Sequence, residues 1–156
     1  MNQKKRHKKY SGWIFDRCLP LCIISPSSVV IKREVFDSAG LFDESLPVCE
    51  DYDMWLRITA RFPVLFIDKP YIIKNGGHQD QLSRRYEAMD RFRIKSIVNI
   101  LNSNVLNEDM RLKALKELEK KCTIVAKGAY KRGKIKEAEF FMKIPEEVLY
   151  GEKFEI

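Results

Sequence analysis

A chain of 156 residues is long enough for one ordinary domain with a core of its own. Its composition, 45% hydrophobic and 33% charged, excludes an intrinsically disordered protein, and no apolar run reaches the roughly 20 residues that cross a bilayer. No signal peptide is recognised at the N-terminus, so we expect a cytoplasmic location with at most peripheral membrane contact.

The net charge of +7 is concentrated at the N-terminus. Residues 1–10 hold five of the 29 basic residues and no acidic one, which leaves 24 basic against 22 acidic residues elsewhere. This basic arm either meets phosphate groups of a lipid, a nucleotide or a nucleic acid, or is simply solvated. No nucleic-acid recognition motif follows it, so no specific nucleic-acid partner is expected.

The predicted elements begin after a turn-type cluster at Ser25-Pro-Ser-Ser. The short β-branched run 29–31 predicts a buried strand. Residues 33–39 predict a brief helix that ends at Gly40, because glycine accepts the left-handed backbone past a helix end. Residues 50–61 predict a helix of about three turns, with acidic residues in its first turn, where the helix dipole favours negative charge.

Two further apolar runs, 64–67 and 71–73, predict buried strands. Helical spacing then starts near Ser83 and continues to residue 101. Two more helices are predicted after it, over 108–131 with Asn107 as N-cap and over 135–142. These patterns divide the chain into a basic arm (1–10), a mixed α/β part (11–104) and a helical hairpin extension (105–156).

The segment from Ser27 to His78 carries the most specific pattern. It reads Ser-Ser-Val-Val-Ile-Lys-Arg-Glu-Val-Phe, then Ala-Gly-Leu-Phe-Asp-Glu, then Glu-Asp-Tyr-Asp-Met-Trp-Leu-Arg, and finally Gly-Gly-His-Gln-Asp-Gln-Leu-Ser. In this order the pieces resemble the C-terminal, acceptor-side half of family 2 glycosyltransferases with the GT-A fold. The resemblance covers about residues 11–95. It implies an α/β fragment that lacks the N-terminal nucleotide-binding half of that fold.

The Glu-Asp pair at 50 and 51 is the candidate catalytic site. A carboxylate at a helix N-terminus is fixed by the backbone and stays ionised, so it can accept a proton. In the resembled family the aspartate of this pair is the general base, a role that falls on Asp51, with Glu50 orienting it or touching the acceptor. The structural alternative is that Asp51 or Asp53 only caps the helix. Asp51-Tyr-Asp53 is not read as a metal motif, because no buried strand precedes it.

The loop after the second predicted strand is the other candidate site. A neutral imidazole can bind Mn²⁺ or a diphosphate oxygen, and the resemblance gives this role to His78, with a divalent metal, Mn²⁺ or Mg²⁺, whose carboxylate ligands are expected to be absent from this chain. The alternative is a surface histidine. The predicted substrate-binding residues are Asp53, Ser27, Ser28, Gln81, Ser83 and Arg84.

The resemblance implies an inverting glycosyltransferase. It would move a sugar from a nucleotide-diphospho-sugar donor to a glycan, lipid-linked or protein acceptor, with this chain as the portion that carries the base. The alternative is a non-catalytic interaction module that docks on a donor-binding partner or forms a homo-oligomer. That alternative predicts an exposed apolar surface.

Overall fold

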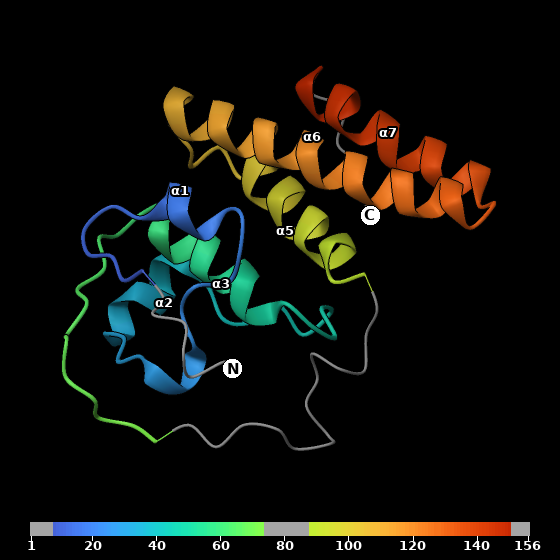
Figure 1. Cartoon of the computed structure of the whole chain (residues 1–156). Helices are drawn as coiled ribbons and strands as arrows, with labels where there is room; N and C mark the ends of the chain where they lie inside the picture. Colours follow the sequence, from blue (N-terminus) through green and yellow to red (C-terminus); the bar gives the residue numbers. More distant parts are fainter. Residues whose placement is uncertain (1–7, 74–87, 151–156) are drawn as a thin grey trace.

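The computed structural model describes residues 8–73 and 88–150, and these residues form a helical protein (Figure 1). In chain order the elements are α1 (Phe15–Cys18), the 3-10 turn η1 (Pro26–Ser28), α2 (Arg33–Ala39), α3 (Glu50–Thr59), α5 (Asp90–Asn102), α6 (Glu108–Lys131) and α7 (Ile135–Leu149). Within these ranges the sole β pairing is an isolated antiparallel bridge between Gly12 and Val64. No helix in this part of the chain has the length and apolar character needed to cross a bilayer.

The expected α/β fragment of the GT-A fold is therefore wrong. None of the three apolar runs that predicted buried strands pairs as a strand. Val29, Ile31 and Val64 are half-buried against the core clusters, but other side chains of the runs face solvent. Val30 is 103% exposed, Leu65 80% and Ile73 92%. A strand needs a neighbour to accept and donate its backbone hydrogen bonds. The described part of the chain supplies only Gly12, whose amide and carbonyl bond those of Val64 at 2.7 and 2.9 Å.

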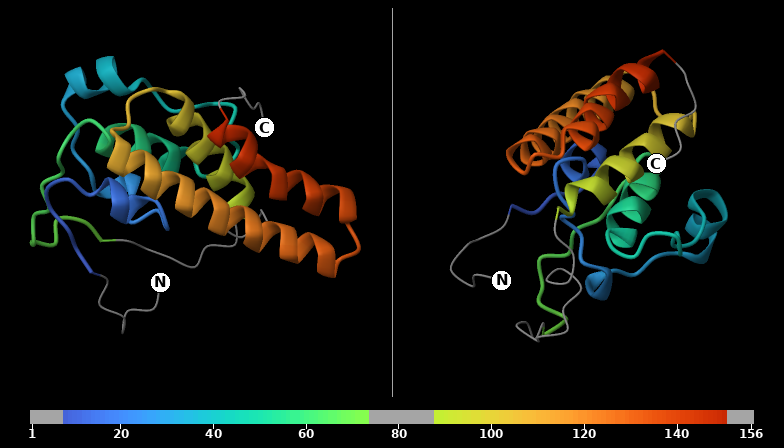
Figure 2. Two further views of the ribbon diagram at one scale, coloured as in Figure 1. Left: turned by 90° about the horizontal axis from the view of Figure 1, so that it is seen from above. Right: turned by 90° about the vertical axis from the view of Figure 1, so that its right-hand side faces the viewer.

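Helices α6 and α7 form an antiparallel hairpin that lies along one side of the molecule (Figures 1 and 2). The predicted N-cap of α6 is confirmed, because the Asn107 side chain accepts a hydrogen bond from the Met110 amide at 2.9 Å. Gly133 turns the chain between the helices with φ of 72°. Helix α7 continues past its predicted end and through Pro145 to Leu149. Ile144 and Val148 are buried. Burial of this face offsets the free-energy cost of the helical hydrogen bond that Pro145 cannot donate.

The main core lies where α5 crosses beneath the hairpin and meets α1 and α3. Buried residues from all five helices belong to one continuous cluster, which includes Phe15, Tyr52, Ile97, Leu118 and Ile144. The hairpin extension and the preceding part of the chain therefore share a core. A buried lysine reinforces this contact. Lys121 of α6 donates to the Pro20 carbonyl at 3.0 Å and pairs with Asp90 at 3.1 Å.

Helix α2 packs on α3 through a smaller cluster. Trp55 and Met54 are buried there together with Ala39 and Ile58, so Trp55 belongs to the core. Arg57 ties the two helices together, since its guanidinium donates to the carbonyls of Ala39 and Leu41 just beyond the end of α2. The start of α3 lies at the junction of the two clusters.

Candidate functional site

The first turn of α3 holds both candidate catalytic carboxylates, Glu50 and Asp51, each half-buried. The residue before them, Cys49, is the helix N-cap and has a left-handed backbone with φ of 65°. This conformation strains any residue other than glycine, and such strain clusters at functional sites. No side chain caps the helix from the N-cap position.

The Asp51 carboxylate is held in place by the backbone. Its Oδ1 accepts a hydrogen bond from the amide of Tyr52 at 2.6 Å, an amide of the first turn. The sequence left open that Asp51 only caps the helix, and this contact is similar to such a cap. It occupies only one of the two carboxylate oxygens, however. The other oxygen has lone pairs to offer a hydroxyl group. A carboxylate placed in this way can accept a proton from a bound alcohol.

A thiol lies beside Asp51. Burial, together with the Asp51 carboxylate, raises the pKa of Cys22 far above its ordinary value, so the thiol stays neutral. Cys22 donates to the carbonyl of Ile24 at 3.3 Å. The loop that leads from α1 to η1 thus runs alongside the start of α3.

The start of α5 also contacts the start of α3. The Cys49 thiol points to the Met89 carbonyl at 3.8 Å, and burial raises the pKa of that thiol to about 11. Arg93 of α5 lies over the Tyr52 ring, 6.0 Å from its centroid. The N-termini of α3 and α5 therefore lie together, and their dipoles both favour negative charge at this place.

Asp53 faces away from this site. Its carboxylate is buried and pairs with Arg57 one turn further along α3, at 2.9 Å. Burial raises the pKa of Asp53, although Arg57 opposes the rise. The geometry gives Asp53 a supporting role, because it holds the arginine that joins α2 to α3.

The remaining predicted site residues are not gathered around Asp51 by the described structure. Ser27 and Ser28 are exposed in η1, where Ser28 donates to the Ser25 carbonyl at 2.8 Å, so they serve the turn. Four predicted residues lie outside the described ranges: His78, Gln81, Ser83 and Arg84. Their assignments stay predictions.

The described residues do not fit the expected divalent metal by themselves. Across residues 8–73 and 88–150 no group of three or more His, Cys, Asp or Glu side chains is placed to hold a metal ion. Cys18, Cys49 and Cys122 are buried free thiols and Cys22 is a half-buried one. Burial raises the pKa of Cys18 to about 11, which disfavours the thiolate that metals bind.

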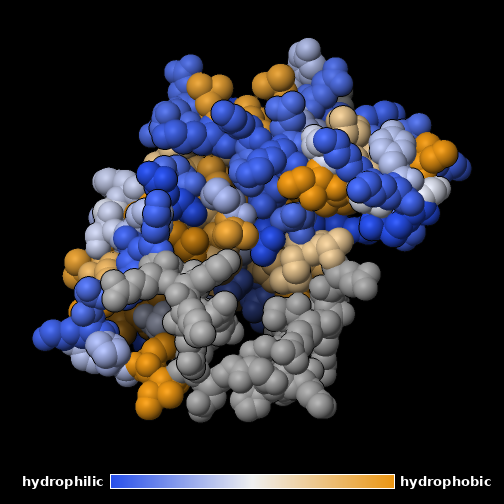
Figure 3. Space-filling model, viewed as in Figure 1, coloured by the Kyte–Doolittle hydropathy of each residue, from blue (hydrophilic) through white to orange (hydrophobic). Residues whose placement is uncertain are grey.

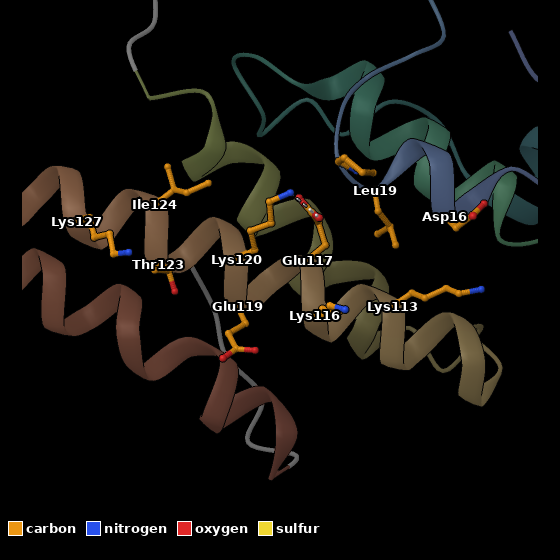
Figure 4. A pocket seen from close by; sticks show the side chains of 11 residues that line it. Asp16, Leu19, Lys113, Lys116, Glu117, Glu119, Lys120, Thr123, Ile124 and Lys127 are labelled. Atoms are coloured by element: carbon orange, nitrogen blue, oxygen red, sulfur yellow. Dashed lines mark ion pairs between the residues drawn. The ribbon is translucent and has the colours of Figure 1, made fainter. Parts of the chain in front are cut away.

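A groove lies elsewhere, between α1 and α6. It has a volume of about 780 Å³ and includes Leu19, Lys116 and Lys120 but neither Glu50 nor Asp51. Figure 4 shows the Lys120 side chain turned toward Glu117, with which it pairs at 3.6 Å. Lys113 pairs with Asp109 at 2.6 Å. The groove is open, and the neighbouring acids offset its cations.

Two residues that shape this part of the molecule were missed by sequence reasoning. Cys22 is far from Asp51 in the sequence, and no spacing rule joins them. Lys121 had a signal, because it falls beside Leu118, Cys122 and Val125 on the apolar side of its helix. A lysine in that position requires buried partners, which Asp90 and Glu117 supply.

Comparison with known proteins finds similarity to proteins named glycosyltransferases. A protein of Rickettsia felis named an uncharacterized glycosyltransferase is 36% identical over 69 residues, which is 43% of this chain and 11% of that protein. Another with this name, from Rickettsia bellii, is 36% identical over 72 residues, 45% of this chain and 10% of that protein. A third, from Rickettsia prowazekii, is 30% identical over 128 residues, 80% of this chain and 36% of that protein.

The chain thus spans 11% and 10% of the length of the first two relatives. No protein-family model matches it, and no solved structure matches it significantly. The comparisons therefore give no independent information on the helical arrangement. They show similarity to proteins whose names give a general class of activity, glycosyl transfer.

Proposed function

We propose that this chain is the acceptor-side part of an inverting glycosyltransferase, and that Asp51 is its general base. The proposal rests on one observation, a half-buried carboxylate fixed at the strained start of α3 in a chain whose relatives are named glycosyltransferases. The acceptor is a sugar hydroxyl of a glycan, a lipid-linked sugar or a glycosylated protein.

In the proposed reaction Asp51 takes the proton of the acceptor hydroxyl as its oxygen attacks the anomeric carbon of the donor. The new carbon–oxygen bond forms on the face opposite the leaving group, so the configuration inverts. The bond to the diphosphate breaks, and its electron pair leaves with the nucleoside diphosphate. General-base assistance of this kind contributes about 10²–10⁴-fold in rate.

The local geometry suits this step. The Tyr52 amide fixes one carboxylate oxygen. The neutral Cys22 thiol also interacts with this carboxylate, and a thiol is a weak donor that a sugar hydroxyl can replace. Glu50 lies on the same turn, where it can bind a second hydroxyl of the acceptor sugar. The paired N-termini of α3 and α5 favour the negative charge of the carboxylates.

A transfer assay with Asp51→Asn tests this role. Asparagine keeps the size of the side chain and the oxygen that accepts from the Tyr52 amide, but it cannot take the proton. The native chain, joined to the donor-binding half that it is expected to lack, is incubated with uridine diphospho-glucose, uridine diphospho-N-acetylglucosamine or guanosine diphospho-mannose and a methyl glycoside acceptor. Release of nucleoside diphosphate should fall about 10²–10⁴-fold in the variant.

The matched control is Asp37→Asn, an exposed residue of α2 with the same change of charge. It should transfer at the native rate. Equal rates for the native chain and Asp51→Asn would refute the assignment of the base.

A second function, an interaction module, is favoured by a different observation. The extended segment 64–73 exposes a run of apolar side chains, among them Leu65 at 80% and Ile73 at 92%. Exposed apolar runs of this kind mark contact surfaces. Such a segment would dock on a donor-binding partner or on a second copy of the chain.

Sedimentation velocity separates the two forms of docking. Self-association would give a concentration-dependent sedimentation coefficient in the native chain, which Leu65→Lys with Ile67→Lys should abolish. A native chain that stays monomeric at all concentrations would exclude the second copy.

A further inference from the structure

The far end of the α6–α7 hairpin carries an unusual accumulation of positive charge. Between Lys120 and Lys136 the sequence has seven basic residues and no acidic one. Five of them are exposed around the turn between the helices, and we call them the hairpin tip: Lys127, Lys131, Arg132, Lys134 and Lys136. Figure 3 shows this end of the molecule, on the right, as blue side chains with orange ones among them.

Most of these cations have no ion-pair partner among the described residues. In the part of the chain that the structure describes, Lys134 alone among the five forms an ion pair, with Glu137 at 3.7 Å. By contrast, Lys113 and Lys120, which line the groove between α1 and α6, each pair with an acid of the same helix. The positive charge of the hairpin tip is therefore available to a partner.

Helix stability explains only part of the charge, because Lys131 and Arg132 lie at the C-terminal end of α6 but other tip cations do not. Cations stabilise the C-terminal end of a helix, but at the N-terminal end they are unfavourable. Lys136 lies in the first turn of α7 and Lys134 is its N-cap. The last carbonyls of α6 already have partners, since the amides of Arg132 and Lys134 donate to Ala129 at 3.0 Å. The fold thus retains cations where they oppose its own stability.

Apolar side chains lie among these cations. Tyr130 is 49% exposed and Ile135 is 58% exposed, and both flank the turn. An aromatic and an aliphatic residue within a ring of lysines match the interface of an anionic membrane, where apolar groups enter below the headgroups and lysines meet phosphates. Single-stranded nucleic acid would instead use several aromatic rings for stacking, and Tyr130 is the one aromatic side chain between Lys120 and Lys136.

We propose that the hairpin tip binds the surface of an anionic lipid membrane, with Tyr130 and Ile135 inserted at headgroup depth. None of the tip residues lies in the first turn of α3, so the proposal does not depend on the sugar-transfer function. If both are right, the tip would bring the chain to the membrane that presents a lipid-linked acceptor.

Vesicle sedimentation tests the proposal. The full chain is mixed with vesicles of equal parts phosphatidylcholine and phosphatidylglycerol, or with pure phosphatidylcholine. We expect retention on the anionic vesicles alone, weakening as salt is added. Each cation near the surface contributes about fivefold to binding. Replacing four of the tip cations by glutamine (K127Q, K131Q, R132Q, K136Q) should therefore weaken binding by at least about a hundredfold.

The matched control removes the same number of charges from exposed positions elsewhere (K32Q, R33Q, K69Q, K113Q). It should bind within about threefold of the native chain, because those residues lie away from the tip. Equal losses in the two variants would overturn the proposal, since binding would then follow net charge alone. The proposal would also fail if the tip variant kept its vesicle binding but lost retention of a single-stranded oligonucleotide.

Two further variants give readouts that a merely structural role would not produce. Ile135→Ser with Tyr130→Ser leaves the charge unchanged and should weaken vesicle binding by about tenfold. Lys136→Gln should raise the midpoint of thermal unfolding, because it removes a cation from the start of α7, while it weakens vesicle binding. A lower midpoint with unchanged binding would show that Lys136 serves the fold.

Discussion

The hairpin of α6 and α7 and the extended segment 64–73 are both rich in apolar residues, yet they end in opposite environments. In the hairpin, apolar residues recur at helical spacing and find partners on the neighbouring helices of the same chain. In the extended segment they stand in consecutive runs, and their backbone has one bridge partner at Gly12. A helix makes its backbone hydrogen bonds within itself and can bury a periodic apolar face on nearby helices. A strand-like run needs a neighbouring strand for its backbone hydrogen bonds.

This contrast predicts where the free energy of unfolding resides. Mutations in the hairpin and its contacts with α5 should destabilise the whole chain, while mutations in the extended segment should change stability little. The predictions below test this difference, beginning with the largest expected effect.

Lys121→Ala should have the largest effect. Lys121 is 4% exposed and joins α6 to the start of α5 and to the loop after α1. Without it, Asp90 and Glu117 lose their shared cation, and breaking a buried pair in this way costs about 3–5 kcal/mol. Urea unfolding followed by circular dichroism measures the loss. If the free energy of unfolding fell by less than about 1 kcal/mol, Lys121 would not hold α6 against α5 and the loop after α1.

Ile144→Ala and Leu65→Ala form a direct pair across the comparison. Ile144 is fully buried in the hairpin, so its truncation should cost about 2–5 kcal/mol. Leu65 is exposed and should change the free energy of unfolding by about 0.5 kcal/mol or less. Similar losses for the two variants would show that the extended segment packs against something in solution.

The stability of the hairpin contact should also depend on pH through Asp90. Hydrogen bonds from Arg93 and Lys121 outweigh the effect of burial and hold the pKa of Asp90 below its usual value. A carboxyl group with a lowered pKa in the folded state stabilises above its unfolded pKa, near 3.9, and loses this contribution as the pH falls further. Asp90→Asn should therefore flatten the acid side of the stability profile. Parallel profiles would contradict this assignment.

Asn107→Ala should destabilise the chain less than the changes at Lys121 and Ile144. The Asn107 side chain caps α6 through the Met110 amide, and loss of such a cap costs about 1 kcal/mol. The change is expected as a shift of the urea midpoint with an unchanged slope. Helix α6 has a side-chain cap at Asn107, whereas α3 has none at Cys49. A loss at Asn107 would therefore show that a local signal helps to define α6, while the start of α3 is defined by packing against other segments.

The sequence predicted the helices well where local signals decide them. Asn107, Gly133 and the spacing of Leu118 and Val125 identify α6 without reference to the rest of the chain. Gly40 marks the end of α2 in the same way. The short helix α1 was not predicted, the end of α3 was placed two residues too far, and the extent of α7 was underestimated, since burial of Val148 continues that helix past Pro145.

The strands failed for a physical reason. A β-branched run such as Val29–Ile31 specifies an extended backbone, but it cannot specify the neighbour that makes a strand. The candidate site shows the same limit. The place of Asp51 at the start of a helix followed from the sequence, whereas its proximity to Cys22 and to Met89 arises from packing between distant segments.

The most direct test of the account is to observe where an acceptor sugar binds. Amide chemical shifts of the ¹⁵N-labelled chain are recorded while a methyl glycoside or an oligosaccharide is added, which requires no donor. We predict that the sugar changes the amide shifts chiefly at Cys22, Glu50 and Asp51. The Asp51→Asn variant should show the same pattern of changes, because it loses the base and not the binding site. Shifts confined to other parts of the chain, or none with any sugar, would contradict the claim that the start of α3 receives the acceptor.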